Sequence, residues 1–393
     1  MRALHRIIGI VVMGLLLWLG GTGALMQSLD LYKLTIHAPE SDPTMMSLNE
    51  GKYGPADFSV ITERDFTAAV LPPTFNYSQA VDTVIEAIHT QSGGVQPRFV
   101  EWRILNGIPI ARVGIGAQTL AFDATTGVAV ASSNIASLSP LELPMSVRQR
   151  TKQLHRFWIR NFFPGVWIEV LSGLVLLIMT TTGVVMYFRL LSARRRLSRF
   201  NPFWSAGGLW RALHRSISII AAVFLLAIAF SGTWIGYESV YGSFHFGPPV
   251  DVSAPLSDGD VRQMVSGTIN AMRRVEPLTP IKVLRVRVYG AMKQGITITG
   301  GEGETRQLVF NAVNGKPASL TEPEYPKSGF PFGVQVHENV KHFHSGMLFG
   351  LAARWMGLFA GLSLMYLSIS GLVMYFQLWL KRRSGERYSF FWV

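Results

Sequence analysis

Four long apolar stretches limit what this chain can fold into more than any other feature of its sequence. They cover Ile7–Met26, Val166–Phe188, Ile217–Gly236 and Trp355–Leu380. Each is about as long as the roughly 20 residues that an α-helix needs to cross the hydrocarbon core of a bilayer. Only 15% of the residues are charged, whereas a typical soluble domain has about a quarter. The sequence therefore predicts a membrane protein with four transmembrane helices.

Composition excludes several classes of function. The chain of 393 residues has a formal net charge of +12 but little charge of either sign, which argues against a nucleic-acid-binding domain. It contains no cysteine, so disulfides, Cys-ligated zinc, iron–sulfur clusters and thioether-attached haem are excluded. The first apolar stretch has a second interpretation as a cleaved signal peptide. It is long for that role and no clear Ala-x-Ala site follows it, so we interpret it as a membrane span.

The placement of Lys and Arg predicts the topology, because basic residues beside span ends stay in the cytoplasm. The connection between the second and third spans contains seven arginines and no acid: Arg189, Arg194, Arg195, Arg196, Arg199, Arg211 and Arg215. This loop and both termini are predicted to be cytoplasmic, with two polar stretches outside. Basic residues at 148–160 oppose this orientation, but they end a long translocated stretch, where the charge rule is weak.

The predicted boundaries divide the chain into eight segments. The transmembrane segments are 1–27, 155–190, 212–238 and 342–381; the outer domains are 28–154 and 239–341; the basic loop and the tail are 191–211 and 382–393.

The two halves of the chain resemble each other. Leu-His-Arg precedes the first, second and third spans at residues 4–6, 154–156 and 213–215, and Thr22-Gly23 and Ser231-Gly232 follow at the same interval in spans one and three. Spans two and four end alike, in Thr182-Gly183 and Ser370-Gly371 followed by similar residues up to a Tyr-Phe pair. These matches predict an internal parallel repeat of the form helix, outer module, helix.

The outer stretches are similar to each other as well. Residues 78–91 and 260–273 have the periodicity of amphipathic helices. Alternating strands are predicted near 98–105, 108–115 and 118–131, and again near 281–289, 294–299 and 306–313. Both third strands lead into a matching turn, Phe122-Asp123 up to Gly127 and Phe310-Asn311 up to Gly315. The fold class predicted is an α-helical membrane protein with two small α+β modules.

These modules resemble PepSY domains, and the spans headed by Leu-His-Arg resemble the PepSY-associated transmembrane proteins. That family includes iron-regulated membrane proteins and ferric-siderophore reductases of the ferrioxamine reductase type. The resemblance covers nearly the entire chain. It implies a protein of the bacterial inner membrane with its modules in the periplasm. It further implies two b-type haems per chain and transfer of electrons to a ferric siderophore.

Four histidines lie beside the span ends and are the candidate iron ligands. The predicted topology puts His5 and His214 at the cytoplasmic ends of spans one and three, and His155 and His344 at the outer ends of spans two and four. Two axial imidazoles suit a haem that shuttles electrons, and an apolar four-helix bundle can enclose a porphyrin. His342 is the alternative to His344, because only one of two residues at i and i+2 faces the bundle. Interfacial anchoring is the alternative role for all of them.

Arginines are the candidate partners of the haem propionates. Arg6, Arg156 and Arg215 each follow one of the four histidines. Arg354, before span four, has two interpretations: a propionate contact, or an ion pair with Glu169 at similar depth. The glycines in the spans also have two interpretations, because close helix packing and space for a macrocycle both favour glycine. This applies to Gly20, Gly21, Gly23, Gly183, Gly232 and Gly371.

Three functions from different classes fit these observations. The first is an electron-transfer oxidoreductase that reduces a ferric siderophore or another ferric complex outside, with a cytoplasmic or quinol donor inside. The second is a non-enzymatic membrane anchor whose PepSY-like modules bind a peptide or protease, and the third is a transporter. We favour the first, because no hydrolase or phosphate-binding motif is evident and four spans are few for a carrier. Besides the ferric complex and the electron donor, the expected partner is the lipid bilayer. We expect no nucleic acid to bind.

Overall fold

The computed structural model describes residues 2–38, 42–48, 68–116, 118–131, 146–157, 164–199, 201–245, 254–289, 292–301, 305–318, 330–385 and 390. The chain divides into two compact units. One is helical and comprises Met1–His37, Met145–Phe246 and Gly329–Val393. The other contains the sheet and comprises Ala38–Pro144 and Gly247–Ser328.

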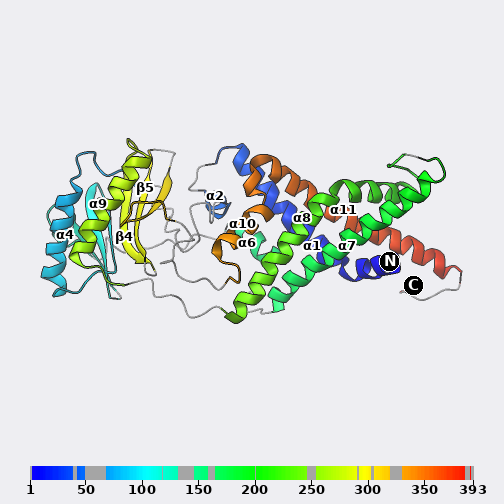
Figure 1. The fold of residues 1–393 in the computed structure, drawn as a ribbon, viewed down its shortest axis with the longest axis horizontal. Helices are drawn as coiled ribbons and strands as arrows, with labels where there is room; N and C mark the ends of the chain where they lie inside the picture. The colour runs from blue at the N-terminus through cyan, green and yellow to red at the C-terminus, as the bar shows by residue number, and fades with distance from the viewer. Residues whose placement is uncertain are drawn as a thin grey trace. The chain divides into compact units, whose positions relative to one another are not determined.

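Four long helices make up most of the helical unit (Figure 1). They are α1 (Arg2–Thr35), α7 (Pro164–Arg195), α8 (Leu209–His245) and α11 (Gly350–Arg383). All four are long and apolar enough to cross a membrane, which confirms the four predicted helices. Three short elements precede α7 and α11: α6 (Val147–His155), α10 (Val334–His344) and the 3₁₀ helix η1 (Met347–Phe349).

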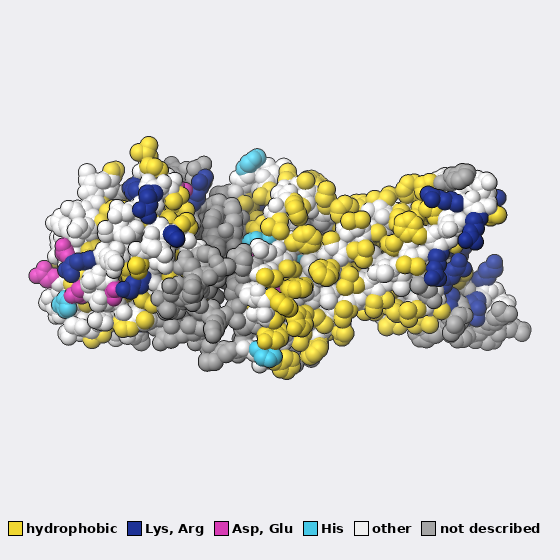
Figure 2. All heavy atoms as spheres, viewed as in Figure 1, with side chains coloured by type: hydrophobic (Ala, Val, Ile, Leu, Met, Phe, Trp, Pro, Cys, Tyr) yellow, Lys and Arg dark blue, Asp and Glu magenta, His cyan; other side chains and the backbone are white. Residues whose placement is uncertain are grey.

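Apolar side chains lie on both the inside and the outside of this bundle. Leu16, Leu176, Leu225 and Leu364 form part of a buried cluster contributed by all four helices. Other apolar side chains point outward; Val223, for example, is 71% exposed. Figure 2 shows hydrophobic atoms covering the middle of the helices, with Lys and Arg gathered at the end where both termini lie. A helix that is apolar all round is typical of a membrane span.

Glycines allow two pairs of helices to cross closely. A Cβ on Gly20 would lie 3.0 Å from the Gly361 carbonyl oxygen, so α1 and α11 touch through their backbones. A Cβ on Gly236 would lie 2.9 Å from the backbone nitrogen of Val170, which brings α8 against α7. These are also the helix pairs with the most extensive packing. Close helix packing is therefore the role of Gly20, one of the two that the sequence left open.

The sheet unit contains one six-stranded antiparallel sheet in the order β3-β2-β1-β4-β5-β6. Its strands are β1 (Phe99–Leu105), β2 (Ile108–Ile115), β3 (Gln118–Asp123), β4 (Ile281–Tyr289), β5 (Met292–Thr299) and β6 (Arg306–Asn311). Three helices accompany it: α2 (Pro43–Leu48), α4 (Tyr77–Ser92) and α9 (Asp258–Val275). Both predicted modules, each a helix followed by three strands, are present.

The third strand of each module is shorter than predicted. β3 ends at Asp123 because the Asp123 carboxylate accepts hydrogen bonds from the backbone N–H groups of Thr125 and Thr126. Asn311 ends β6 in the same way, with Val313 and Asn314 as donors. Such side-chain bonds compete with strand pairing and start a turn. The expected third strands near 118–131 and 306–313 were therefore too long.

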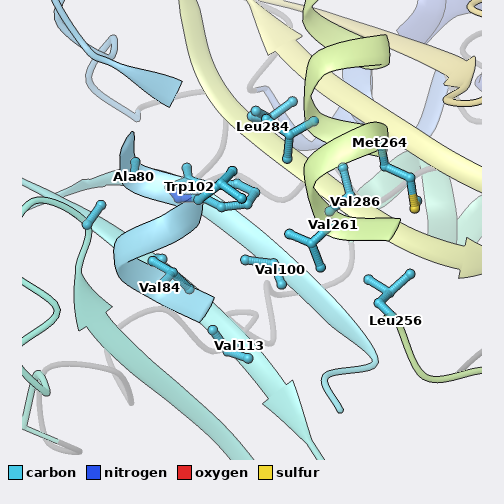
Figure 3. Packing of buried hydrophobic residues seen from close by; sticks show 14 of the residues in the cluster. Ala80, Val84, Val100, Trp102, Val113, Leu256, Val261, Met264, Leu284 and Val286 are labelled. Atoms are coloured by element: carbon cyan, nitrogen blue, oxygen red, sulfur yellow. The ribbon is translucent and has the colours of Figure 1, made fainter. Parts of the chain in front are cut away.

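One face of the sheet is covered by α4 and α9. Figure 3 shows Val84 of α4 and Met264 of α9 against strand residues such as Trp102 and Val286. Trp102 is 1% exposed and Val286 is fully buried. Alternate residues of β1 and β4 supply this core, as the period of two in a strand requires. The two modules thus share one hydrophobic core.

β1 and β4 join the modules through an antiparallel pair in which Glu101 lies opposite Arg285. The fully buried Glu101 carboxylate accepts hydrogen bonds from Arg285 and, at 2.9 Å, from Arg112 of β2. Arg103 lies 3.5 Å away. Burial alone would raise the pKa of Glu101, but the three guanidinium groups lower it to about 2. A buried ion cluster therefore lies at the centre of the shared sheet.

Candidate functional site

A cavity lined by His5 and His214 lies within the helical bundle. It has a volume of about 370 Å³ and receives side chains from α1, α7, α8 and α11. Apolar residues such as Leu176 and Leu367 form most of its wall. A cavity of this size is in the range of cofactor pockets, roughly 300–1,000 Å³. The two imidazoles predicted as the inner pair thus face one apolar cavity, from α1 and α8.

Each of these imidazoles bonds to a hydroxyl group on another helix. His5 Nδ1 lies 2.8 Å from Thr182 Oγ1 of α7. His214 Nδ1 lies 2.7 Å from Ser370 Oγ of α11. Both hydroxyl residues directly precede a glycine, and both belong to the matching ends of spans two and four.

The outer pair repeats the arrangement. His155 Nδ1 lies 2.8 Å from Thr22 Oγ1 of α1, and His344 Nδ1 lies 2.9 Å from Ser231 Oγ of α8. His155 is the last residue of α6 and His344 the last of α10. The two imidazoles are within electrostatic range of each other. All four predicted ligands therefore have the same kind of partner.

The glycine after each hydroxyl residue lies beside the imidazole ring. A Cβ on Gly23 would lie 3.6 Å from Cε1 of His155, and one on Gly183 would lie 3.5 Å from Cε1 of His5. The corresponding distances are 3.2 Å from Gly232 to His344 and 3.9 Å from Gly371 to His214. A Cβ would be crowded only at Gly232 and would make an ordinary van der Waals contact at the other three positions.

The hydroxyl protons are already used, which identifies the imidazole tautomer. Thr182 donates to the Ile178 carbonyl at 2.7 Å, and Ser231 donates to the Ala227 carbonyl at 2.8 Å. A hydroxyl has one proton, so its oxygen accepts the bond from the histidine. The Nδ1 atom therefore bears the ring proton and Nε2 presents a lone pair. Thr22 and Ser370 donate to carbonyls of their own helices in the same way.

Arg6 and Arg215 line the inner cavity beside the two histidines. Arg2 and Arg211 line it as well, and among the described residues no Asp or Glu belongs to the lining. Arg215 Nη2 donates to the carbonyls of Trp204 and Ala206, at 2.8 Å each. The cavity thus combines an apolar wall, two imidazoles and an excess of positive charge.

The arginines of the outer region have carboxylate partners. Arg156 Nε lies 3.3 Å from Glu169 Oε1, and its Nη2 donates to Ser239. Arg354 forms a buried ion pair with Asp30 of α1. The Glu169–Arg354 pair considered from the sequence is therefore wrong, although both residues are ion-paired. Equal depth on two helices does not tell which faces they present.

His342 lacks the arrangement that the four other histidines share. Its Nε2 lies 3.7 Å from Glu338 Oε2 of the same helix. His344, two residues later, reaches Ser231 and Gly232 of α8. The structure therefore gives the hydroxyl–glycine partner to His344.

Two buried ionic groups were not identified from the sequence. Asp30 accepts hydrogen bonds from Arg148 of α6, at 2.6 Å, and from Arg354 of α11. Glu238 of α8 is fully buried and accepts a bond from His337 Nδ1 at 2.7 Å. The sequence contains a signal for both acids: Asp30 and Glu238 lie shortly after long apolar stretches, and acidic residues are rare beside membrane spans.

The comparison with protein families supports the whole-chain resemblance. A family model described as the PepSY-associated TM region matches residues 2–378. This range includes all four histidines, their hydroxyl–glycine partners and both modules of the sheet. No curated protein matches the chain.

Proposed function

The chain belongs to the family of PepSY-associated transmembrane proteins, and from this membership and its four imidazoles we propose a di-haem b-type oxidoreductase. It carries electrons across the bacterial inner membrane. Its substrate is a ferric siderophore or another ferric complex on the periplasmic side, from which reduction releases ferrous iron. The electron donor is a cytoplasmic protein or a quinol.

The observation that carries this proposal is the fourfold repetition of one local geometry. At each site a histidine Nδ1 meets a hydroxyl oxygen and its Cε1 meets a glycine. A histidine that only anchors a helix at the interface needs neither feature. Hydrogen bonding at Nδ1 fixes the ring and its tautomer, which is how proteins orient imidazole ligands of metals.

The inner histidines and their apolar cavity fit a b-type haem, and the outer histidines offer the same donors for a second. His5 and His214 would hold the inner haem, and His155 and His344 the outer one. When bound, each haem would supply an iron that takes up and returns one electron. With two imidazoles to hold each iron, the chain's contribution would be to exclude other iron ligands. Arg6 and Arg215 offer positive charge to carboxylates, and the apolar wall keeps water out of the inner cavity.

An internal parallel repeat and a periplasmic sheet unit are part of the proposal. β1 precedes α7 and β4 follows α8, yet they pair in one sheet. Two such insertions share a sheet only if they lie on the same side of the membrane. The arginine-rich connection between α7 and α8 then lies on the other side, which the positive-inside rule identifies as the cytoplasm.

Release of iron follows from the chemistry of the substrate. One electron added to the ferric complex gives ferrous iron. Hard oxygen donors bind the smaller charge of ferrous iron more weakly, so the siderophore lets it go. The substrate needs no covalent intermediate with the protein.

Haem content of the purified protein tests the proposal. We expect absorption spectra of the detergent-purified chain, oxidised and reduced with dithionite, to show two b-type haems in a pyridine haemochrome count. His5→Ala and His214→Ala each lose one haem, and His155→Ala and His344→Ala each lose the other. His89→Ala is the matched control, because His89 is exposed and paired with Asp258 in the sheet unit.

A second measurement tests the substrate. The reduced protein mixed with a ferric hydroxamate complex should be reoxidised, with ferrous iron trapped by ferrozine in equal amount. A colourless wild type from cells supplied with haem would contradict the cofactor and favour the peptide-binding anchor. Two haems without reoxidation would contradict the ferric substrate alone.

A further inference from the structure

Two short sequences near the chain's arginine-rich end match each other. They are Arg-Phe-Asn-Pro-Phe-Trp at 199–204 and Arg-Tyr-Ser-Phe-Phe-Trp at 387–392. The first begins at the same interval after Tyr187 as the second does after Tyr375, so the two stretches align without a gap. We call them the first and second fold-back segments. Of these, 199, 201–204 and 390 are among the described residues. Because the segment occurs in both halves of the chain, we expect its role to lie at the inner cavity, which both halves line.

The first fold-back segment returns to the helix that it has just left. The Tyr187 hydroxyl donates to the Pro202 carbonyl at 3.0 Å. The Trp204 indole stacks on the Tyr187 ring, with centroids 5.8 Å apart and planes inclined by 25°. Tyr187 is 6% exposed and lines the inner cavity. The segment therefore packs against the cavity wall.

The second fold-back segment makes the same backbone contact. The Tyr375 hydroxyl donates to the carbonyl of Phe390, which matches Pro202 in the sequence. The rings of Tyr375 and Phe390 lie 5.2 Å apart. Tyr375 also lines the inner cavity. The two segments thus hold equivalent tyrosines at one site.

Trp204 also holds the arginine next to His214. The Arg215 guanidinium lies 4.7 Å from the centre of the indole, and its Nη2 donates to the Trp204 carbonyl. Arg194 lies over the same ring at 4.6 Å. In the other half Arg6 follows His5 as Arg215 follows His214, and Arg6 and Tyr375 both line the inner cavity.

We propose that the first fold-back segment positions Arg215 to bind a carboxylate of the inner haem, with Trp204 fixing its guanidinium group. This rests on the proposed function, which supplies the haem. Stacking on an aromatic face and two carbonyl contacts restrict a long side chain that otherwise moves freely. Two guanidinium groups on one ring repel each other, so the arrangement favours an anion in reach of them. Trp204 is a positioning residue.

Redox potential and haem release distinguish positioning from simple anchoring of the loop. A nearby cation stabilises the reduced haem, which has one positive charge fewer, and raises its potential. We expect Trp204→Leu to lower the midpoint potential of one haem. The same variant should release that haem about 10-fold faster to apomyoglobin, the lower end of the effect of lost supporting contacts. Trp204→Phe keeps an aromatic face and should retain most of both properties.

Two further variants complete the test. Phe203→Leu is the matched control, because Phe203 is in the same segment and 52% exposed; it should change neither property. Arg215→Gln should reproduce the effect of Trp204→Leu on the same haem, identified as the one that His214→Ala loses. The double variant should add little to either, since both remove one contact.

The outcomes separate this inference from the proposed function. Wild-type protein without haem would contradict the proposed function. Two bound haems with unchanged potential and release in Trp204→Leu would contradict the positioning role and leave the proposed function intact. If Trp204→Leu does not fold, Arg215→Gln decides. A shift confined to the outer haem would also overturn the inference.

Discussion

A single hydroxyl group orients each candidate iron ligand. Thr182 donates its proton to the Ile178 carbonyl, so its oxygen accepts from His5. The bond to the Ile178 carbonyl thus holds the Thr182 hydroxyl oxygen as a fixed acceptor for an imidazole on another helix. Threonine and serine both serve, since Thr22 and Thr182 occur in one half and Ser231 and Ser370 in the other.

Removal of this hydroxyl should weaken haem binding at one site. We expect Thr182→Val, which keeps the shape of the side chain, to reduce the affinity for the inner haem about 10- to 100-fold, as loss of an outer-shell partner does at other metal sites. The rate of haem transfer to apomyoglobin measures the change. The outer haem in the same molecule is the internal reference.

Thr182→Ser is the matched control, because it keeps the hydroxyl and loses only a methyl group. It should release haem at nearly the wild-type rate. Equal release from the serine and valine variants would show that the bond between Thr182 and His5 has no part in holding the ligand.

The sequence predicts the histidines and not their partners. Leu-His-Arg at three span ends and the match of His344 with them suffice to select His5, His155, His214 and His344. Their contacts depend on which helices are neighbours, and spacing along one helix does not contain that information. The same reason explains the wrong pairing of Glu169 with Arg354. Periodicity predicts which face of a helix a residue lies on, but it does not predict that Arg354 pairs with Asp30 and Glu169 with Arg156.

At the scale of secondary structure elements, the pairing of β1 with β4 joins the two modules into one sheet. Both strands have charged residues on the face opposite α4 and α9, and these charges meet at Glu101 and Arg285. Strand and helix periods predict each module separately, including the amphipathic helices over 78–91 and near 260–273. Alternation assigns a residue to a face but does not name the neighbouring strand. The pairing therefore could not be predicted.

Glu101 should stabilise the sheet strongly at neutral pH. Glu101→Gln leaves Arg285 and Arg112 buried without their carboxylate, and breaking a buried pair costs about 3–5 kcal/mol. The pKa of Glu101 falls from its ordinary value of 4.5 to about 2 in the folded chain. A lowered pKa means that the stabilisation is complete above about pH 4.5 and disappears as the pH falls towards 2. The difference between variant and wild type should shrink over this range.

Pulse proteolysis in urea measures this difference in the full chain, with thermolysin at neutral pH and pepsin in acid. Cleavage of peptides from β1 and β4 gives the free energy of unfolding of the sheet. Asp82→Asn is the control, because the Asp82–Arg262 pair is exposed and such pairs contribute about 0–1 kcal/mol. A difference between Glu101→Gln and wild type that does not change with pH would contradict the assigned charge of Glu101.

At the scale of the whole molecule, the shared sheet constrains the membrane topology. One half of the sheet comes from the stretch between α1 and α7 and the other from the stretch between α8 and α11. With four crossing helices, both stretches leave the membrane on one side, and the loop between α7 and α8 lies on the other. Charge placement in the sequence predicts the same arrangement independently.

The lack of cysteine makes this topology directly testable, because any introduced thiol is unique. Gln91 of α4 and Gln263 of α9 are exposed in the sheet unit, and Ser205 is exposed in the loop before α8. We expect a membrane-impermeant maleimide to label Gln91→Cys and Gln263→Cys in cells whose outer membrane alone is permeabilised. Ser205→Cys should react only after detergent opens the inner membrane, since the arginines beside it keep the loop in the cytoplasm.

Labelling of the two sheet positions should agree for a stronger reason than charge. β1 and β4 exchange backbone hydrogen bonds, so Gln91 and Gln263 belong to one folded unit and cannot lie on opposite sides of a bilayer. Labelling of only one of them in intact inner membranes would contradict the shared sheet. Labelling of Ser205→Cys alone would show that the orientation in the membrane is the opposite of the one predicted. The ferric substrate would then meet the sheet unit in the cytoplasm, and reduction outside the cell membrane would no longer be tenable.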